Sequence, residues 1–120
     1  MKKILFIDDE VQLLNVYKKF FSKKNFTVLT APDGKKGLGL ALREQPDLIV
    51  LDIRMPGLDG IETLKRLRKK DKKTKVIMLT GYGTADYLRV TSDLGVSDFI
   101  SKPFDLGALL RVFQGLLGDS

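Results

Sequence analysis

The chain has 120 residues, enough for one domain with its own core and too few for two of ordinary size. Hydrophobic residues make up 43% and charged residues 30%, a balance typical of a globular protein rather than a disordered one. The sequence contains no cysteine and no histidine, which excludes disulfides, thiolate or imidazole metal sites, a cysteine nucleophile and a Ser-His-Asp relay. Chemistry is left to carboxylates, lysines, hydroxyls and a metal that they could hold.

No apolar run is long enough to cross a bilayer. The first residues, Met1-Lys2-Lys3, are followed by only four apolar residues before Asp8-Asp9-Glu10, which is too short for a secretory signal. We therefore expect a cytoplasmic protein that forms one domain over residues 1–120.

Short apolar segments alternate with helical stripes five times along the chain. The first expected elements are a strand at Lys3–Ile7, a helix whose apolar stripe is Leu14, Tyr17 and Phe21, a strand at Thr27–Ala31 and a helix at Gly34–Gln45. A strand at Leu48–Leu51 and a helix marked by Ile61, Leu64 and Leu67 follow. The last elements are a strand at Lys75–Leu79, a helix marked by Tyr87, Val90, Thr91 and Leu94, a strand at Asp98–Ser101 and a helix at Leu106–Leu117. Repeated strand–helix units predict a parallel sheet with helices on both faces.

The segment Gly34–Gln45 has the least helical sequence, because Gly37 and Gly39 each cost about 1 kcal/mol in a helix interior. Three of the expected strands are continuously apolar, which is typical of strands covered on both faces. The sequence therefore predicts a doubly wound α/β fold.

Polar residues follow the expected strands where each strand ends. Asp8 and Asp9 follow the first strand, Asp52 the third, Thr80 the fourth and Lys102 the fifth. Ligands of open parallel sheets bind at the carboxyl ends of the strands, so we expect these side chains to converge. Three carboxylates, Lys102 and one divalent cation would balance in charge, and oxygen ligands suit Mg²⁺ or Mn²⁺. Such a site suits phosphoryl transfer, with a carboxylate as nucleophile.

Each of these residues also has a purely structural interpretation. Asp8 or Asp9 could be the N-cap of the following helix, and Asp52 a turn residue before the proline. Thr80 could be a β-branched strand end and Lys102 a solvated lysine. Taken singly, each structural interpretation is the better one, but their coincidence at four strand ends favours a functional site.

Four motifs together resemble the response-regulator receiver domains of two-component signalling. They are Asp8-Asp9-Glu10, the stretch from Leu51-Asp52 through Met55-Pro56 to Asp59-Gly60, Leu79-Thr80-Gly81, and Lys102-Pro103-Phe104. The similarity extends over essentially the whole chain. It implies a flavodoxin-like sheet of five parallel strands in the order 2-1-3-4-5 with five helices.

The resemblance also implies roles. Asp52 would be the phosphoacceptor, taking a phosphoryl group from a sensor histidine kinase or a histidine-phosphotransfer protein. Asp9 would bind Mg²⁺ (or Mn²⁺) directly and Asp8 mostly through water, and the backbone carbonyl of Arg54 would complete the ligands with Asp52. The remaining roles concern the phosphoryl group and its signal: Lys102 would bridge to it, Thr80 and Phe99 would form a switch pair, and Pro103 would follow a cis bond.

Some positions depart from the usual family pattern. Gly81 and Gly83 make the loop after Thr80 glycine-rich, and Thr91 and Val96 stand where small alanines are frequent. Arg54 and Tyr82 would tune the access of water to the acyl phosphate, a combination that resembles single-domain phosphorelay proteins of sporulation type. Only residues 118–120 follow the last expected helix, so we expect a stand-alone relay module. The alternative is a receiver cut from a longer DNA-binding or enzymatic regulator.

The net charge of +6 and the pI of about 9.6 raise the possibility of a nucleic-acid-binding protein. Eight of the eleven residues from Lys65 to Lys75 are basic, but they would lie at the end of the sheet opposite Asp52, where lysines usually form a solvated rim. Nucleic-acid binding by this domain is therefore not expected. A haloacid-type phosphatase would need a second aspartate at Arg54, so we expect a signalling module and not an enzyme acting on a metabolite.

Overall fold

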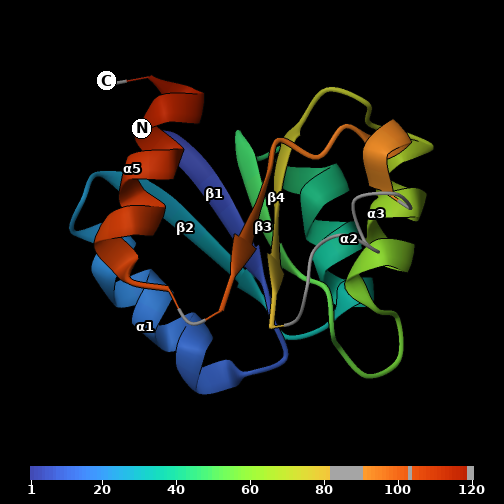
Figure 1. Cartoon of the computed structure of the whole chain (residues 1–120), viewed down its shortest axis with the longest axis horizontal. Coiled ribbons are helices and arrows are strands. Elements are labelled where there is room, and N and C mark those ends of the chain that lie inside the picture. The colour runs from blue at the N-terminus through green and yellow to red at the C-terminus, as the bar shows by residue number, and fades with distance from the viewer. Residues whose placement is uncertain (82–90, 103, 119–120) are drawn as a thin grey trace.

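A computed structural model describes residues 1–81, 91–102 and 104–118 of the chain. Its centre is one five-stranded sheet in the order β2-β1-β3-β4-β5, in which every neighbouring pair is parallel (Figure 1). The strands are β1 (Lys2–Ile7), β2 (Phe26–Ala31), β3 (Leu48–Asp52), β4 (Lys75–Thr80) and β5 (Asp98–Ser101). The predicted strand order is thereby confirmed, and each predicted strand boundary lies within one residue of the observed one.

Helices cover both faces of the sheet. Figure 1 shows two of them, α1 (Val11–Ser22) and α5 (Leu106–Leu117), on one side, and α2 (Gly34–Glu44) and α3 (Gly60–Arg68) on the other. Among the described residues none of the helices is long and apolar enough to span a membrane.

The described residues contain four α-helices where five were predicted. The predicted stripe from Tyr87 to Leu94 lies partly outside them, including Tyr87 and Val90. Its described end, Ser92–Leu94, forms a short 3-10 helix, η1. Gly95 follows with a φ of 68°, and this left-handed conformation, which glycine adopts without steric cost, ends the helical segment.

The helix α2 forms despite its glycines. Asp33 caps it by accepting a hydrogen bond from the backbone N–H of Lys36 at 2.8 Å. A Cβ at Gly37 would come within 2.5 Å of the Ile7 side chain, so glycine allows α2 to lie close against β1. Close packing of the helix on the sheet therefore outweighs the low helix propensity of this residue.

Alternation along the strands divides the buried side chains into two cores. On β1, Ile4 and Phe6 pack with α1 and α5, whereas Leu5 and Ile7 pack with α2 and α3. The other central strands follow the same rule, for example Ile77 and Met78 on β4. This alternation decides which layer each polar residue at a strand end faces.

Candidate functional site

The predicted site residues meet at the edge of the sheet where the strands end. Continuing the alternation of β1, β3 and β5 places Asp8, Asp52 and Lys102 on the face of the sheet covered by α1 and α5. The strand register places these residues at the same level along the sheet. Ile7 pairs with Leu51, so Asp8 and Asp52 follow paired residues, and the backbone N–H of Lys102 donates to the carbonyl of Thr80 at 2.7 Å. The sheet thus brings together residues 94 positions apart in the chain.

Asp8, Asp9 and Asp52 form one cluster of carboxylates. One oxygen from each lies within 4.8 Å of the others. Asp8 is 1% and Asp52 6% exposed, whereas Asp9 is exposed to solvent. The pKa of Asp52 is raised to about 6, chiefly by burial and next by the charge of Asp8, against the opposing effect of Lys102. Burial likewise raises the pKa of Asp8. Negative charge at this site is therefore under-compensated by the protein alone.

Lys102 is the cation of the cluster. Its Nζ lies 3.5 Å from Oδ2 of Asp52, 3.6 Å from Oδ2 of Asp8 and 3.9 Å from Oε1 of Glu10. These distances are longer than those of a charge-assisted hydrogen bond, so the ammonium acts as a point charge shared by three acids. Lys102 offsets one of the four formal negative charges of Asp8, Asp9, Asp52 and Glu10, so three are unmatched when all four acids are ionised.

The donor atoms present fit a hard divalent cation. Oδ1 of Asp8 accepts a hydrogen bond from the backbone N–H of Glu10 at 2.9 Å, whereas its buried Oδ2 has no hydrogen-bond partner among the described residues. An orphaned, buried carboxylate oxygen beside two further carboxylates is the oxygen-only set that Mg²⁺ or Mn²⁺ prefers. Asp8 is also not the N-cap of α1, since that position is held by Glu10.

The connection from β3 to α3 fixes the position of Asp52. The backbone N–H of Gly60 donates to the carbonyl of Ile53 at 2.9 Å, which draws the start of α3 against the end of β3. A Cβ at Gly60 would overlap the backbone carbonyl oxygen of Asp52. The side chain of Asp52 accepts a long hydrogen bond, 3.4 Å, from the backbone N–H of Arg54. The carbonyl of Arg54 as a cation ligand stays a prediction.

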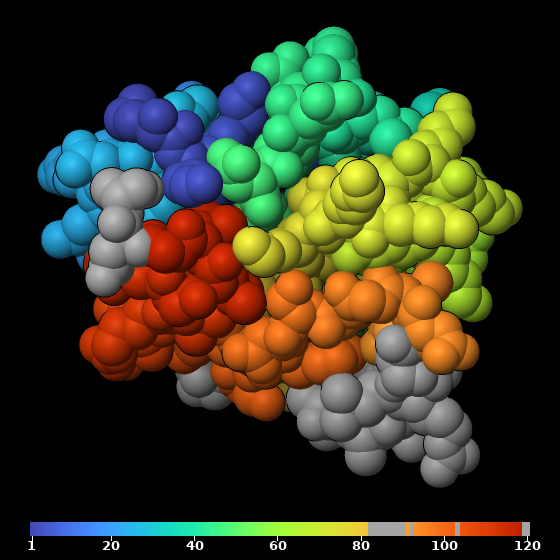
Figure 2. Space-filling model, turned by 90° about the horizontal axis from the view of Figure 1, so that it is seen from above, coloured from blue at the N-terminus to red at the C-terminus, as the bar shows by residue number. Residues whose placement is uncertain are grey.

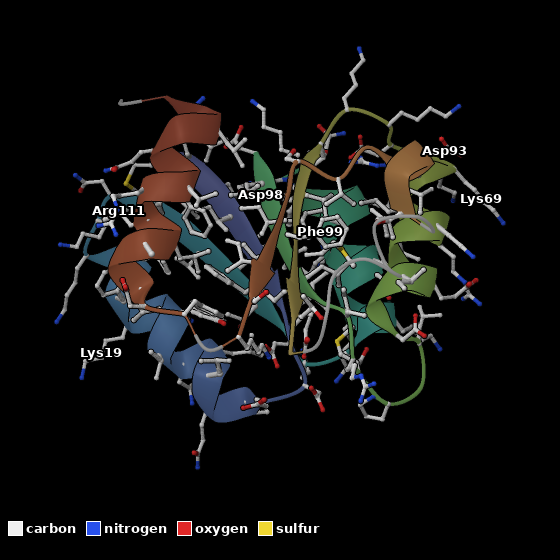
Figure 3. The ribbon with its side chains drawn as sticks, in the orientation of Figure 1. Lys19, Lys69, Asp93, Asp98, Phe99 and Arg111 are labelled. Carbon is white, nitrogen blue, oxygen red and sulfur yellow. The ribbon has the colours of Figure 1, made fainter. Side chains whose placement is uncertain are left out.

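Thr80 and Phe99 lie on the other face of the sheet from Asp8. Phe99 on β5 pairs with Met78 on β4 and packs, half-buried, with the α2 and α3 layer (Figure 3). Thr80 is two residues beyond Met78, so its buried side chain faces the same layer. Their shared face agrees with the predicted switch pair, whose role stays a prediction. Tyr82, Gly83 and Pro103, with its predicted cis bond, lie outside the described residues.

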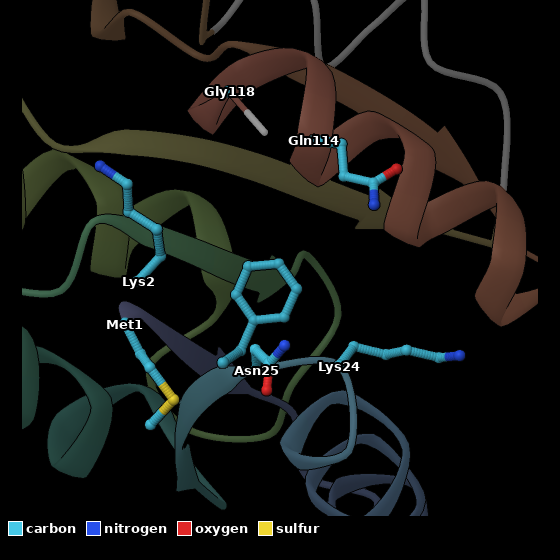
Figure 4. A pocket seen from close by; sticks show the side chains of 7 residues that line it. Met1, Lys2, Lys24, Asn25, Gln114 and Gly118 are labelled. Atoms are coloured by element: carbon cyan, nitrogen blue, oxygen red, sulfur yellow. The ribbon is translucent and has the colours of Figure 1, made fainter. Parts of the chain in front are cut away.

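The hollow at the opposite end of the sheet lacks this chemistry. A hollow of about 580 Å³ lies at the opposite end of the sheet, where β1 and β2 begin and α5 ends (Figure 4). Its walls include Lys2, Lys24, Asn25 and Gln114, with no carboxylate or hydroxyl among the lining side chains. It therefore offers no nucleophile or acidic cation ligand.

Sequence reasoning missed three contributors to the site. Glu10 shares Lys102, and Gly60 was quoted only as part of a motif, without its contact to Asp52. The hydroxyl of Tyr17 also lies within electrostatic reach of the acids, which raise its pKa further after burial. The helical periodicity of α1 predicted Tyr17 as a core residue. The one sequence feature that could have indicated a polar role was its hydroxyl in an otherwise apolar stripe.

Comparison with known proteins agrees with the family resemblance of the four sequence motifs. The sequence model of the response regulator receiver domain matches residues 4–114. The chain is 36% identical over 105 residues to sporulation initiation phosphotransferase F of Bacillus subtilis, covering 88% of this chain and 85% of that protein. Among solved structures, chemotaxis protein CheY4 of Vibrio cholerae superposes with a TM-score of 0.91 at 28% identity, covering 98% of this chain and 99% of that one.

Response regulator TrrA of Thermotoga maritima, solved in complex with Mg²⁺–BeF, is 32% identical with a TM-score of 0.85, covering 98% of this chain and 100% of that one. Transcriptional regulators among the curated relatives are longer, and the chain spans 43–51% of their length. With the family model matching most of the sequence and the sheet order of the family present in the structure, the chain belongs to the response regulator receiver domains of two-component signalling.

Proposed function

We propose that this receiver domain accepts a phosphoryl group on Asp52 from a phosphohistidine of another protein, with a divalent cation such as Mg²⁺ at the acidic cluster. The observation that carries the proposal is the geometry around Asp52. Its carboxylate is buried at a strand end, 3.5 Å from Lys102 and within one cluster with Asp8 and Asp9. A buried carboxylate near one lysine and two further acids is better explained as a site for transfer of a charged phosphoryl group than as a structural ion pair.

The covalent step needs only groups that this site and a phosphohistidine supply. An oxygen of the ionised Asp52 attacks phosphorus, the new O–P bond forms and the P–N bond to the donor imidazole breaks. The imidazole leaves with the electron pair and takes a proton from solvent. The product is an acyl phosphate, the same group as the aspartyl phosphate of ATPases that use a carboxylate nucleophile.

The protein groups around Asp52 would position the incoming phosphoryl group. Lys102 would exchange part of its interaction with Asp8 and Glu10 for a phosphoryl oxygen, and the Thr80 hydroxyl would donate to another. Asp8, Asp9 and Asp52, with the Arg54 carbonyl, would hold the cation. When bound, the cation supplies the positive charge that neutralises the transferring group.

The signal would be a change of conformation. Phosphorylation adds negative charge beside Thr80, and movement of Thr80 toward it would let Phe99, on the same face of β4 and β5, follow. A ligand or modification shifts such an equilibrium by its different interactions with the two states. We infer that the domain is a signalling module and catalyses only its own phosphorylation and dephosphorylation.

The direct partner would be a sensor histidine kinase or a histidine-phosphotransfer protein. Residues 1–120 contain no histidine, so the donor histidine and the histidine of any relay acceptor would lie outside this sequence. Similarity over 85% of a sporulation phosphotransferase favours a phosphorelay intermediate. Similarity to only about half of the longer transcriptional regulators supports the second candidate, a receiver that controls an attached output domain.

Phosphorylation can be tested with acetyl phosphate and Mg²⁺, followed by intact mass. We expect the mass of one phosphoryl group on the wild type, no addition on Asp52→Asn, and none when EDTA removes the cation. Asp98→Asn is the matched control, because Asp98 is an exposed acid on β5 whose carboxylate bonds only the adjacent Phe99 N–H among the described residues. An adduct that persists in Asp52→Asn would disprove the assignment.

The relay can be tested separately by mixing phosphorylated protein with histidine-phosphotransfer proteins. Transfer of the label to a histidine supports a relay. If Asp52 loses its phosphoryl group only to water, a terminal receiver is the better description.

A further inference from the structure

Tyr17 on α1 is fully buried, and its hydroxyl has no hydrogen-bond partner among the residues that the structure describes. A buried hydroxyl without a partner is costly, so such groups in folded proteins are nearly always bonded to protein or water. The chain could have kept the same packing with phenylalanine at this position. The hydroxyl therefore needs an explanation.

The ring of Tyr17 packs against two other aromatic rings. It stacks on Phe6 of β1, with centroids 4.4 Å apart and planes at 17°, and on Phe104, with centroids 6.4 Å apart and planes at 11°. Because the ring is fully buried and packed against these two rings, the hydroxyl cannot turn toward solvent without disrupting the core around α1 and α5. Its direction is thus set by the fold.

That direction leads toward the acidic cluster. Side chains on a helix lean toward its N-terminus, and α1 begins directly after Asp8-Asp9-Glu10. Tyr17 stacks on Phe6, and Phe6 and Asp8 are two residues apart on β1, so both point to the face that α1 covers. The hydroxyl and the carboxylate of Asp8 consequently lie on the same side of the sheet, toward the same end.

The charges agree with this placement. After burial, the largest contribution raising the pKa of Tyr17 comes from Asp8, followed by Asp52 and Glu10. Oδ2 of Asp8 is itself buried and without a hydrogen-bond partner within the described part of the chain. The Tyr17 hydroxyl, a buried donor without an acceptor, and Asp8 Oδ2, a buried oxygen without a hydrogen-bond donor, thus lie on the same side of the sheet among the described residues.

We propose that Tyr17 is a positioning residue of the phosphorylation site, whose hydroxyl donates a hydrogen bond to Asp8 through one enclosed water. The two oxygens are not in direct hydrogen-bond contact, and a buried water needs two to four polar partners. Tyr17 Oη, Asp8 Oδ2 and Lys102 Nζ, whose ammonium lies 3.6 Å from that Asp8 oxygen, would be its three partners. The link would hold the Asp8 carboxylate oriented toward the cation, a role that rests on the proposed function.

Tyr17→Phe tests the hydroxyl alone, because it keeps the ring and its stacking. Isothermal titration with Mg²⁺ should give a dissociation constant about tenfold weaker than that of the wild type, the usual size of effect for a residue that orients a metal ligand. Phe21→Leu is the matched control, since Phe21 is the next buried aromatic on the same stripe of α1 and carries no hydroxyl. It should lower the urea midpoint and leave Mg²⁺ affinity unchanged.

A double-mutant cycle without metal tests the link itself. Urea unfolding in EDTA of the wild type, Tyr17→Phe, Asp8→Asn and the double variant should show that the effects of the two substitutions are not additive. Tyr17→Phe alone should lower the midpoint if the hydroxyl is bonded. A higher midpoint, additive effects or unchanged Mg²⁺ affinity would overturn the proposal. Failure of the wild type to bind Mg²⁺ would instead refute the proposed function, and the cycle would still decide whether Tyr17 and Asp8 are linked.

Discussion

Replacing Asp52 with asparagine should make the metal-free protein more stable at neutral pH. Folding raises the pKa of this carboxyl from its usual 3.8 to about 6, chiefly because burial disfavours the charged form. The folded state therefore binds the proton more tightly than the unfolded state does. The stability from Asp52 is fully present below pH 4 and is lost as pH rises to about 6, where the buried group is forced to ionise.

The size of the effect follows from the same values. A rise from 3.8 to about 6 is about two pH units, and each unit is worth about 1.36 kcal/mol, which gives about 3 kcal/mol at pH 7. Asparagine has nearly the shape of protonated aspartate and avoids this cost. The attraction of Lys102 to the ionised carboxylate already lowers the pKa and is thus included in the difference.

Urea unfolding in EDTA at a series of pH values measures the difference directly. Asp52→Asn should exceed the wild type in its free energy of unfolding by about 2–3 kcal/mol at pH 7, and the difference should disappear near pH 4. Asp98→Asn, at an exposed carboxylate, should show no comparable gain. If the free energies of unfolding of Asp52→Asn and the wild type are equal at pH 7, or differ by an amount that does not change with pH, ionisation of the buried Asp52 does not destabilise the folded protein and the reasoning is refuted.

Three further predictions concern phosphorylation of Asp52 and its consequences. Gly60→Ala should lower both the thermal midpoint and the rate of phosphorylation by acetyl phosphate, because the new Cβ meets the backbone of Asp52, whereas Gly39→Ala, which meets nothing within 4 Å, should do neither. Thr80→Ala should still accept phosphate, but NMR signals of Phe99 should no longer respond to it as they do in the wild type. Figure 2 views the molecule from above, the end at which the strands of Figure 1 begin. Neutralising the four lysines in the segment just before β4, Lys69, Lys70, Lys72 and Lys73, should leave the rate of phosphorylation by acetyl phosphate within about twofold of the wild type, since salt screens charges at the end opposite Asp52.

The sheet and the convergence of the acids could be predicted because both follow from local pattern and one rule of topology. Continuous apolar runs located the central strands, and parallel pairing brings their carboxyl ends to one edge, so Asp8, Asp52 and Lys102 had to be near one another. The helix at Gly34–Glu44 was harder to predict from propensity. The reason that glycine occurs in this helix is the close contact between Gly37 and Ile7, which exists only in the folded chain.

Atomic partners inside the site could not be predicted in this way. Periodicity placed Tyr17 on the buried stripe of its helix but did not say where its hydroxyl ends, which depends on the rings of Phe6 and Phe104. The raised pKa of Asp52 likewise depends on burial by side chains from several elements. Sequence patterns specify faces and edges, whereas the distances that decide charge states arise from packing.

The two faces of the sheet have different parts in the proposed switch. Asp8, Asp52 and Lys102 lie toward α1 and α5, where Tyr17 also points, whereas Thr80 and Phe99 lie toward α2 and α3. In the proposed switch Thr80, on the strand next to Asp52, would move toward the phosphoryl group, and its movement would pass to Phe99 on the α2 and α3 side of the sheet. Because strand alternation separates the layer that carries the acids from the layer that contains Phe99, phosphorylation on one side of the sheet would change the surface on the other side.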